Sequence, residues 1–433
     1  MELLNPVLVS VLAMIILCLC RLNVILSLLI AGLIGGVAAG LSIKQSMDIL
    51  ISGMGDNAET ALSYILLGAY AIAISQTGLA GILSNRISSL VKGKKVILIF
   101  IIVFIACLSQ NLIPIHIAFI PILIPPLLGI MNKFRLDRRA MACGLTFGLK
   151  APYIMLPVGF GLVFHNLIKD QMIANGVSVE TSQVWKSMLI PGLGMFAGLL
   201  IAVFITYSGQ RNYKTSGYNE PEDTQSFQWN KSHTLTLISA ISAFVVQLST
   251  ESLPLGALTG LGVLLISGTL KWSEMEDTMK GGLQMMAFIA IVMLVASGYG
   301  KVLRETDAVQ AFVGHLNMIV GNSKVLAALF MLLTGLLVTM GIGTSFGTIP
   351  ILATIFCPLG IELGFSAAGI IVLLGVAGAL GDAGSPASDS TLGPTSGLNM
   401  DNQHDHIKDT CIPTFLHFNI PLIIFGLVAS LIL

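Results

Sequence analysis

The sequence has very little charge. Only 10% of its 433 residues are Asp, Glu, Lys or Arg, whereas 55% are hydrophobic and the mean hydropathy is +0.90. Soluble globular domains typically carry about 25% charged residues, so this chain cannot cover a water-facing surface. The 22 basic and 22 acidic residues cancel, and no basic surplus indicates a nucleic-acid partner. We therefore predict a protein whose solvent is the lipid bilayer.

The motifs of several enzyme classes are also missing. There is no phosphate-binding GxxxxGK[ST] loop, so ATP does not drive the protein directly, and neither GxSxG nor HExxH occurs. The six cysteines fall mostly in apolar runs, where they are typical of small core residues. We expect no enzymatic activity, no organic cofactor and no transition-metal site.

The start of the chain does not resemble a secretory signal. Glu2 stands where basic residues would be expected, and Arg21 follows the first apolar run instead of preceding it. Because positive charge remains on the cytoplasmic side, this order predicts a first span that enters from outside.

Ten runs are long and apolar enough to be candidate membrane spans, which need about 20 residues. They are residues 5–20, 23–42, 58–80, 141–164, 187–208, 234–250, 252–270, 283–299, 367–397 and 413–433.

Two further apolar blocks, 96–131 and 325–360, predict re-entrant hairpins. Dense basic clusters flank 96–131 on both sides, and the positive-inside rule places both in the cytoplasm, so the block must enter and return. Its centre is polar and contains Pro114; the block 325–360 likewise has a Gly-rich centre followed by Pro350. Broken backbone of this kind is tolerated at membrane depth only within protein or beside water.

The two halves of the chain repeat one another. Similar short segments recur in the same order at offsets of roughly 220 to 234 residues. Each half has five spans and one hairpin, and because five is odd the second half is inverted. We thus predict an all-α polytopic membrane protein of two inverted repeats, 1–208 and 234–433, joined by a cytoplasmic loop at 209–233. Both termini come out external, with 15 of the 22 Lys and Arg residues inside and 6 outside.

Inverted repeats with broken helices are typical of secondary transporters, whose sites lie near the membrane midplane. Lys150 lies in one broken span, 141–164, and Asp382 and Asp389 lie in the repeat-related span 367–397. Charge in lipid costs at least about 2.5 kcal/mol per group, which favours a functional role. The alternatives are a structural ion pair between the halves and, for Asp389, a helix cap.

Polar side chains near these breaks are further candidates for substrate or ion binding. The hairpin tips could bind Na+ through oxygen ligands, or the residues could merely satisfy free backbone groups at the turns. His116 could gate protons or be an ordinary buried histidine, and Asp56 with Asn57 could form an ion relay or a helix cap. The remaining candidates are Ser109, Gln110, Asn111, Thr344, Ser345, Ser385 and Ser388.

Three segments resemble a known family. SGMGDNAETALSYILLG, SQNLIPIHIAFIPI and GDAGSPASDSTLGPTSGL are similar to the NhaC-type Na+/H+ antiporters of the ion-transporter superfamily, in particular to a subgroup with amino-acid permeases, histidine permeases among them. The resemblance implies a scaffold and a transport domain, an elevator-type fold and a homodimer. Many relatives have Ser-Asn-Thr at the hairpin tip, where this chain has Ser109-Gln110-Asn111 and Gly343-Thr344-Ser345, so the resemblance does not fix the number and place of the Na+ sites.

Two functions remain open at this point. The first is an ion-coupled permease of the inner (plasma) membrane for a small organic solute, an amino acid such as histidine, with Na+ or H+ as coupling ion. The second is a Na+/H+ antiporter in which an intramembrane Asp binds either cation. The amides and hydroxyls of both tips, together with a lysine, exceed what a bare antiporter needs, which favours the permease. A membrane-embedded enzyme or a passive channel is a third class, which no motif supports.

Overall fold

The computed structural model is helical throughout the part of the chain that it describes. It describes residues 5–20, 22–78, 91, 94–111, 120–121, 123–158, 160–214, 230–250, 252–306, 323–342 and 345–433. Within these ranges the only strand-like pairing is an isolated bridge between Leu136 and Gln210.

The helices of the first half are α1 (Pro6–Leu19), α2 (Val24–Ala38), α3 (Ile43–Met54), η1 (Gly55–Asn57), α4 (Ala58–Gln76), α6 (Lys95–Asn111), η2 (Pro125–Leu127), α8 (Leu128–Lys133), α9 (Arg138–Met155), α10 (Phe160–Ala174), α11 (Thr181–Ile201) and η3 (Ala202–Thr206). Those of the second half are α12 (Lys231–Thr250), α13 (Leu253–Ile266), η4 (Trp272–Glu274), α14 (Met275–Glu305), α17 (Lys324–Ile342), α18 (Ser345–Glu362), α19 (Ala367–Ala379), α20 (Asp389–Leu398), η5 (His406–Cys411), α21 (Ile412–Thr414), η6 (Phe415–Asn419) and α22 (Ile420–Ile432).

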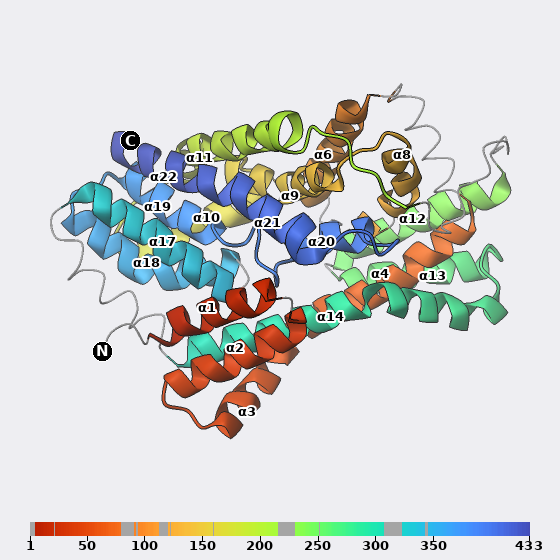
Figure 1. Ribbon diagram of the computed structural model, residues 1–433, viewed down its shortest axis with the longest axis horizontal. Coiled ribbons are helices and arrows are strands. Elements are labelled where there is room, and N and C mark those ends of the chain that lie inside the picture. Colours follow the sequence, from red (N-terminus) through yellow and green to blue (C-terminus); the bar gives the residue numbers. More distant parts are fainter. Residues whose placement is uncertain are drawn as a thin grey trace.

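These helices form two layers, each built from both halves of the chain (Figure 1). The long helix α14 packs against α2, α3 and α4, and with α1, α12 and α13 this group forms the α14 layer. In the other layer, called the α9 layer, α9 packs on α6, α11 and α20, while α17, α18, α19 and α22 pack together. The layers meet where α14 contacts α17 and α20, and where α1 contacts α17.

Glycine allows the closest crossings in the α14 layer. A Cβ on Gly282 of α14 would lie 2.2 Å from the backbone N of Ala69 in α4, and a Cβ on Gly298 would lie 2.2 Å from the carbonyl of Leu50 in α3. Small residues at such contacts let helix backbones approach closely, as in other membrane bundles.

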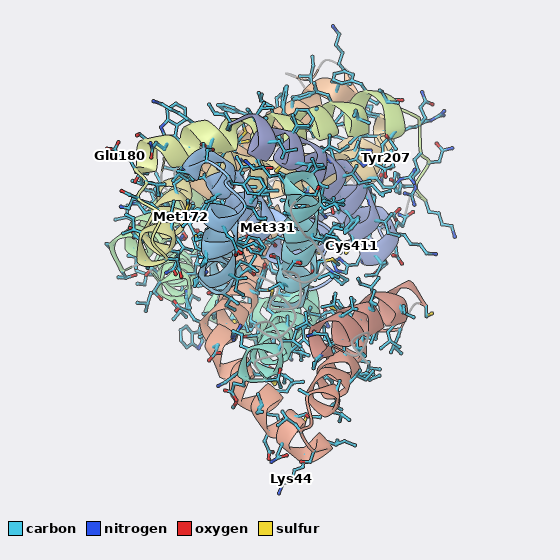
Figure 2. All side chains as sticks on the ribbon, turned by 90° about the vertical axis from the view of Figure 1, so that its left-hand side faces the viewer. Lys44, Met172, Glu180, Tyr207, Met331 and Cys411 are labelled. Carbon is cyan, nitrogen blue, oxygen red and sulfur yellow. The ribbon has the colours of Figure 1, made fainter. Side chains whose placement is uncertain are left out.

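The chain is a multi-pass membrane protein. In the described residues, four helices are long and apolar enough to cross a bilayer, namely Thr181–Thr206, Met286–Glu305, Lys324–Gly341 and His406–Ile432. Two bent pairs, Arg138–Met155 with Phe160–Ala174 and Ser345–Ala353 with Ile355–Glu362, could add two more. Glu180 and Tyr207, which flank α11–η3, lie at opposite edges of the molecule, and Lys44 marks the tip of the α14 layer (Figure 2).

Several boundaries differ from those that the sequence predicts. The span predicted at 283–299 is only part of α14, because the charged residues before it continue the helix from Met275. The final span begins at His406 instead of 413, because the Asp405 side chain accepts a hydrogen bond from the Lys408 N–H and starts a π-helical turn. Of the first predicted hairpin, the structure describes α6, η2 and α8, while its tip lies outside the described residues.

Candidate functional site

The first functional helix, α9, is buried along nearly its whole length, and Lys150 lies in its last turns with 7% of its surface exposed. The helix ends at Met155. Leu156, the residue before Pro157, adopts an extended conformation, as residues preceding proline do. The gap between Met155 and Phe160 bends α9 and α10 by 48° relative to each other.

The second functional segment is the irregular stretch 380–388 between α19 and α20. Gly381 has φ +80° and Gly384 has φ +96°, a region that favours glycine. Asn419 supports this stretch: its Oδ1 accepts a hydrogen bond from the Gly381 N–H at 2.9 Å, and its Nδ2 donates to the Ala383 carbonyl at 2.6 Å. Free backbone groups at membrane depth are thus satisfied by a side chain.

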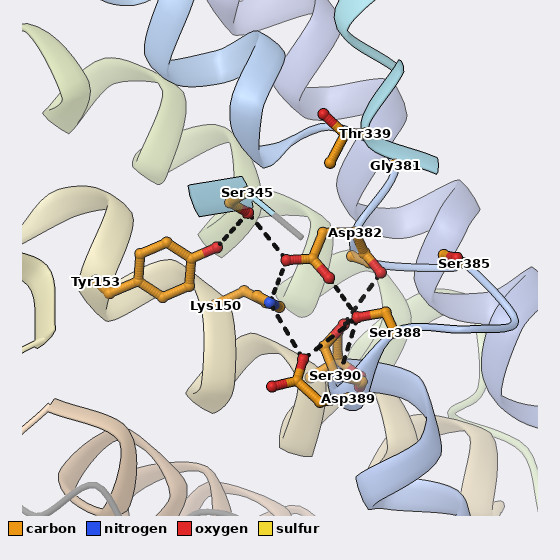
Figure 3. A network of polar contacts seen from close by, with 12 residues as sticks. Lys150, Tyr153, Thr339, Ser345, Gly381, Asp382, Ser385, Ser388, Asp389 and Ser390 are labelled. Carbon is orange, nitrogen blue, oxygen red and sulfur yellow. Dashed lines mark hydrogen bonds and ion pairs between the residues drawn. The ribbon is translucent and has the colours of Figure 1, made fainter. Parts of the chain in front are cut away.

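These two breaks bring together Lys150, Asp382 and Asp389 (Figure 3). The Lys150 ammonium contacts the Asp382 carboxylate directly and lies 3.5 Å from Asp389 Oδ1. Ser345 Oγ donates to Asp382 Oδ2 at 2.9 Å, and Ser388 Oγ donates to Asp382 Oδ1. Asp382 therefore accepts hydrogen bonds from three side chains, which offsets the cost of burying its charge.

Tyr153 extends this network by one link. Its hydroxyl lies 3.0 Å from Ser345 Oγ, and because Ser345 donates to Asp382, Tyr153 is the donor of this pair. The Lys150 ammonium also lies 5.4 Å from the centre of the Tyr153 ring, within the range of a cation–π contact. Tyr153 thus orients the Ser345 hydroxyl, which donates to Asp382, and its ring contacts the Lys150 ammonium.

The three ionised groups carry a formal charge of −1, because two carboxylates face one ammonium. Their burial differs: 2% of the Asp382 side chain is exposed, against 33% of the Asp389 side chain. Asp389 also occupies the first turn of α20, where the helix dipole stabilises negative charge. The more exposed carboxylate is thus the one at the helix end.

Other hydroxyls fix the backbone around the network. Thr146 Oγ1 of α9 donates to the Ser390 carbonyl at 2.8 Å, and Ser390 Oγ donates to the Asp382 carbonyl at 3.1 Å. Thr391 Oγ1 donates to the Ser385 carbonyl. The first bond ties the start of α20 to α9 and so joins the two halves of the chain, and the other two hold the loop before α20 against that helix.

The remaining predicted site residues lie in different places. Ser385 is fully buried, and its Oγ accepts a hydrogen bond from the Ala387 N–H at 3.2 Å, so it shapes the loop. Ser109 Oγ donates to the Ala106 carbonyl of its own helix. Asp56 lies in η1 of the α14 layer, 3.6 Å from Arg304.

Several predicted residues fall outside what the structure describes. His116 and Thr344 lie in undescribed stretches, and so do the side chains of Gln110, Asn111 and Asn57. Their proposed roles remain predictions from the sequence.

Sequence reasoning missed three residues that belong to the site. Tyr153 stands one helical turn after Lys150, so its i, i+3 spacing could have indicated it. Ser390 directly follows Asp389 and could have been included with Ser388. For Asn419 the sequence offers only a polar residue within the last apolar span.

A second ionic cluster lies at the opposite end of α9. Arg138, with no exposed surface, forms a bidentate pair with Asp401 at 2.6 and 2.5 Å and stacks over Tyr213 at 4.2 Å. Burial alone would raise the pKa of Asp401, but the hydrogen bonds and charge of Arg138 outweigh it and lower that pKa. In the same loop, burial lowers the pKa of His404 to about 3, so its imidazole is neutral.

Known proteins share the sequence features of this chain. A model described as "Na+/H+ antiporter family" matches residues 144–427, which contain the whole Lys150–Asp382–Asp389 network. The chain belongs to the Na+/H+ antiporter family. A second model, "Na+-H+ antiporter family", matches residues 5–91. This confirms the resemblance carried by the sequence motifs, and family membership indicates a secondary transporter.

The chain is also similar to relatives along its full length. It is 48% identical to a membrane protein of Vibrio parahaemolyticus, over 99% of this chain and 100% of that one. It is 45% identical, over 99% and 100%, to a Bacillus subtilis protein named "Putative amino acid transporter YuiF". Among solved structures, the Alcanivorax borkumensis YdaH transporter matches at 14% identity and a TM-score of 0.44, covering 90% of this chain and 88% of that chain. Neisseria gonorrhoeae MtrF matches at 16% identity and a TM-score of 0.45, covering 89% and 84%.

Proposed function

We propose that this protein is an ion-coupled transporter of an amino acid, located in the inner (plasma) membrane with both termini external. The observation that carries the proposal is the buried network in which one ammonium meets two carboxylates at the breaks of two helices. Its formal charge of −1 is suited to one further cation. The name of the Bacillus subtilis relative supports an amino acid as solute.

Lys150 is the moving part of the proposed coupling. Its ammonium contacts Asp382 and lies 3.5 Å from Asp389, so a small rotation would change its partner. Asp382, with the hydroxyls of Ser345 and Ser388, would then present the oxygen ligands that Na+ prefers, or a carboxylate for H+. The coupling ion thus replaces the lysine at Asp382.

Alternating access follows from the two layers. The network lies in the α9 layer, and the α14 layer contacts it through α17 and α20. In the proposed elevator motion, the α9 layer carries the bound ion and solute past the α14 layer. Neutralising the network lowers the cost of this movement, because uncompensated charge in a low-dielectric environment is expensive. The two inverted repeats supply the two end states, and a homodimer holds the α14 layer fixed.

A Na+/H+ antiporter is the second candidate. The partly exposed Asp389 favours it, because a carboxylate that borders on solvent can exchange Na+ for H+ without an organic solute. In this case the exchange of Na+ for H+ would by itself complete the transport cycle.

Uptake into proteoliposomes distinguishes the two functions. Purified protein is reconstituted, an inward Na+ or H+ gradient is imposed, and a panel of radiolabelled amino acids is followed together with a pH-sensitive dye. The proposal predicts accumulation of at least one amino acid that collapses when the gradient is removed. Proton efflux on Na+ addition with no solute uptake would refute the permease and establish the antiporter.

A further inference from the structure

A polar cavity of about 540 Å³ lies between the two layers, lined by residues other than those of the ionic network. Ile72 of α4 and residues of α14 form one wall, and α20 with the loop that follows it forms the other. Small-molecule sites in proteins have volumes of roughly 300–1,000 Å³, so the cavity is large enough for a small organic solute.

Gln284 shows that the cavity is built for polar contents. It lies in α14 at the start of an apolar stretch, is exposed, and lines the cavity. A primary amide without hydrogen-bond partners costs several kcal/mol in an apolar environment, about 2–7 depending on the reference. The cavity provides the polar surroundings that make a glutamine acceptable at this place.

The opposite wall is one face of α20. Leu392, Ser396 and Asn399 line the cavity at spacings of four and three residues, which places them on a single side of the helix. Asp389 precedes Leu392 by three residues, a rise of about 4.5 Å at 1.5 Å per residue. The wall therefore leads along α20 to the partly exposed carboxylate of the network.

The described residues that line the cavity include no Lys, Arg, Asp or Glu. Hydrogen-bonding capacity comes from the amides Gln284, Asn399 and Asn402 and from hydroxyls such as Ser396. The imidazole of His406 is held by Thr395 Oγ1 at 2.8 Å and the Pro386 carbonyl at 3.0 Å. The cavity itself is thus neutral, and the charge that it approaches is the −1 network.

We propose that this cavity binds the transported solute, with the ammonium group of an amino acid toward Asp389. The carboxylate and side chain of the solute take hydrogen bonds from the uncharged amides of Gln284 and Asn399. Lys150 is not among the described residues that line the cavity, so the site leaves the solute carboxylate to these amides and not to a cation. The class of solute rests on the proposed function, whereas the site rests on the cavity.

Binding to the purified protein tests the site independently of transport. The thermal midpoint of unfolding is measured in detergent with each of the twenty amino acids, since a ligand of the folded state raises it. The best ligand is then compared with its N-acetyl derivative, which lacks the ammonium, and its decarboxylated amine. We expect stabilisation by the amino acid, weaker stabilisation by the amine and none by the N-acetyl derivative. Equal stabilisation by the N-acetyl derivative, or no stabilisation by any amino acid, would overturn the proposal.

Two variants at opposite walls locate the ligand. Gln284→Leu and Asn399→Leu should each raise the half-saturating concentration about tenfold, the effect of about 1.4 kcal/mol. Gln171→Leu in α10, away from the cavity, is the matched control and should bind as the wild type does. Unchanged binding in both cavity variants, with a wild-type elution profile in size exclusion, would place the solute elsewhere.

Uptake in proteoliposomes separates this inference from the proposed function. Binding without gradient-driven accumulation would refute transport and leave the cavity site intact. Accumulation by both variants with a wild-type KM would refute the cavity site and leave transport intact.

Discussion

Lys150 is held inside the α9 layer by carboxylates from the other half of the chain. Its ammonium and the Asp382 carboxylate are both almost fully buried, so neither can be solvated by water if its partner is removed. Breaking a buried pair by removing one member costs about 3–5 kcal/mol, far more than the intact pair contributes.

We predict that Lys150→Met destabilises the protein by about 3–5 kcal/mol, because Asp382 is left charged in an apolar interior. Lys150→Met combined with Asp382→Asn should recover much of this loss and remain inactive in uptake. Lys169→Met, which removes a pair whose carboxylate partner Asp170 is mostly exposed, is the control and should change stability by less than about 1 kcal/mol. Thermal unfolding of the four proteins checks this, and a wild-type midpoint for Lys150→Met would contradict it.

At Tyr64 we predict a substitution that does not lower the stability of the protein. Its hydroxyl, in α4, is buried and has no hydrogen-bond partner among the described residues. An unsatisfied buried hydroxyl costs about 1–3 kcal/mol, so Tyr64→Phe should leave the unfolding midpoint unchanged or raise it.

Tyr299→Phe is the matched control, since that hydroxyl lies 3.1 Å from Ser10 Oγ. Its loss should lower stability by about 1 kcal/mol. If Tyr64→Phe lowered the midpoint as much as Tyr299→Phe, the hydroxyl of Tyr64 would have a partner in the folded state.

At the scale of elements, the break between α19 and α20 determines the geometry of the site. Gly381 has a left-handed conformation, and a Cβ there would lie 2.6 Å from the Leu336 carbonyl of α17. The glycine therefore sets both the backbone direction that presents Asp382 and the spacing between the loop and α17.

Gly381→Ala should lower stability by at least about 1–2 kcal/mol and abolish uptake, because the strained residue and the close contact both displace Asp382. Gly262→Ala is the control: Gly262 lies inside α13, and a Cβ there would point into open space. It should be neutral or stabilise by up to about 1 kcal/mol. Circular dichroism melts and uptake check both, and an active Gly381→Ala protein of normal stability would contradict the account.

The loop between α20 and η5 gives the protein a pH dependence. His404 is neutral in the folded state with a pKa of about 3, whereas an unfolded histidine titrates near 6.5. The unfolded chain binds the extra proton, so stability should fall as the pH drops from about 6.5 towards 3. Asp401, with its lowered pKa, adds a further loss below about pH 4.

Unfolding midpoints measured between pH 7.5 and 5 test this dependence. His404→Gln should show a flatter profile over this range than the wild type. An identical slope in His404→Gln would exclude His404 as the group responsible.

Part of this arrangement could be predicted from the sequence, for a physical reason. Lys150, Asp382 and Asp389 were identifiable because isolated charge in apolar runs must have a partner. Asn419 and the Arg138–Asp401 pair could not be found, because their contacts span 38 and 263 residues and only the tertiary packing brings them together. Helix ends such as the start of α14 depend on local capping and on neighbouring helices, which hydropathy alone does not record.

At the scale of the whole molecule, each layer contains helices from both halves of the chain. The ionic network therefore joins α9 of the first half to α20 and the loop before it in the second half. A change of charge at this junction can act on both halves together, which is what coupling an ion to a conformational change requires.

Gradient-driven uptake by Asp389→Asn is the most direct test of the claim that this network couples ion and solute. The substitution changes the formal charge of the network from −1 to 0 while Lys150 keeps its contact with Asp382, so we expect a folded protein. The matched control is Asp170→Asn, at an exposed position in α10. We predict that Asp389→Asn no longer accumulates solute in response to an ion gradient, whereas Asp170→Asn does so as the wild type does. Wild-type accumulation with unchanged ion dependence in Asp389→Asn would contradict it.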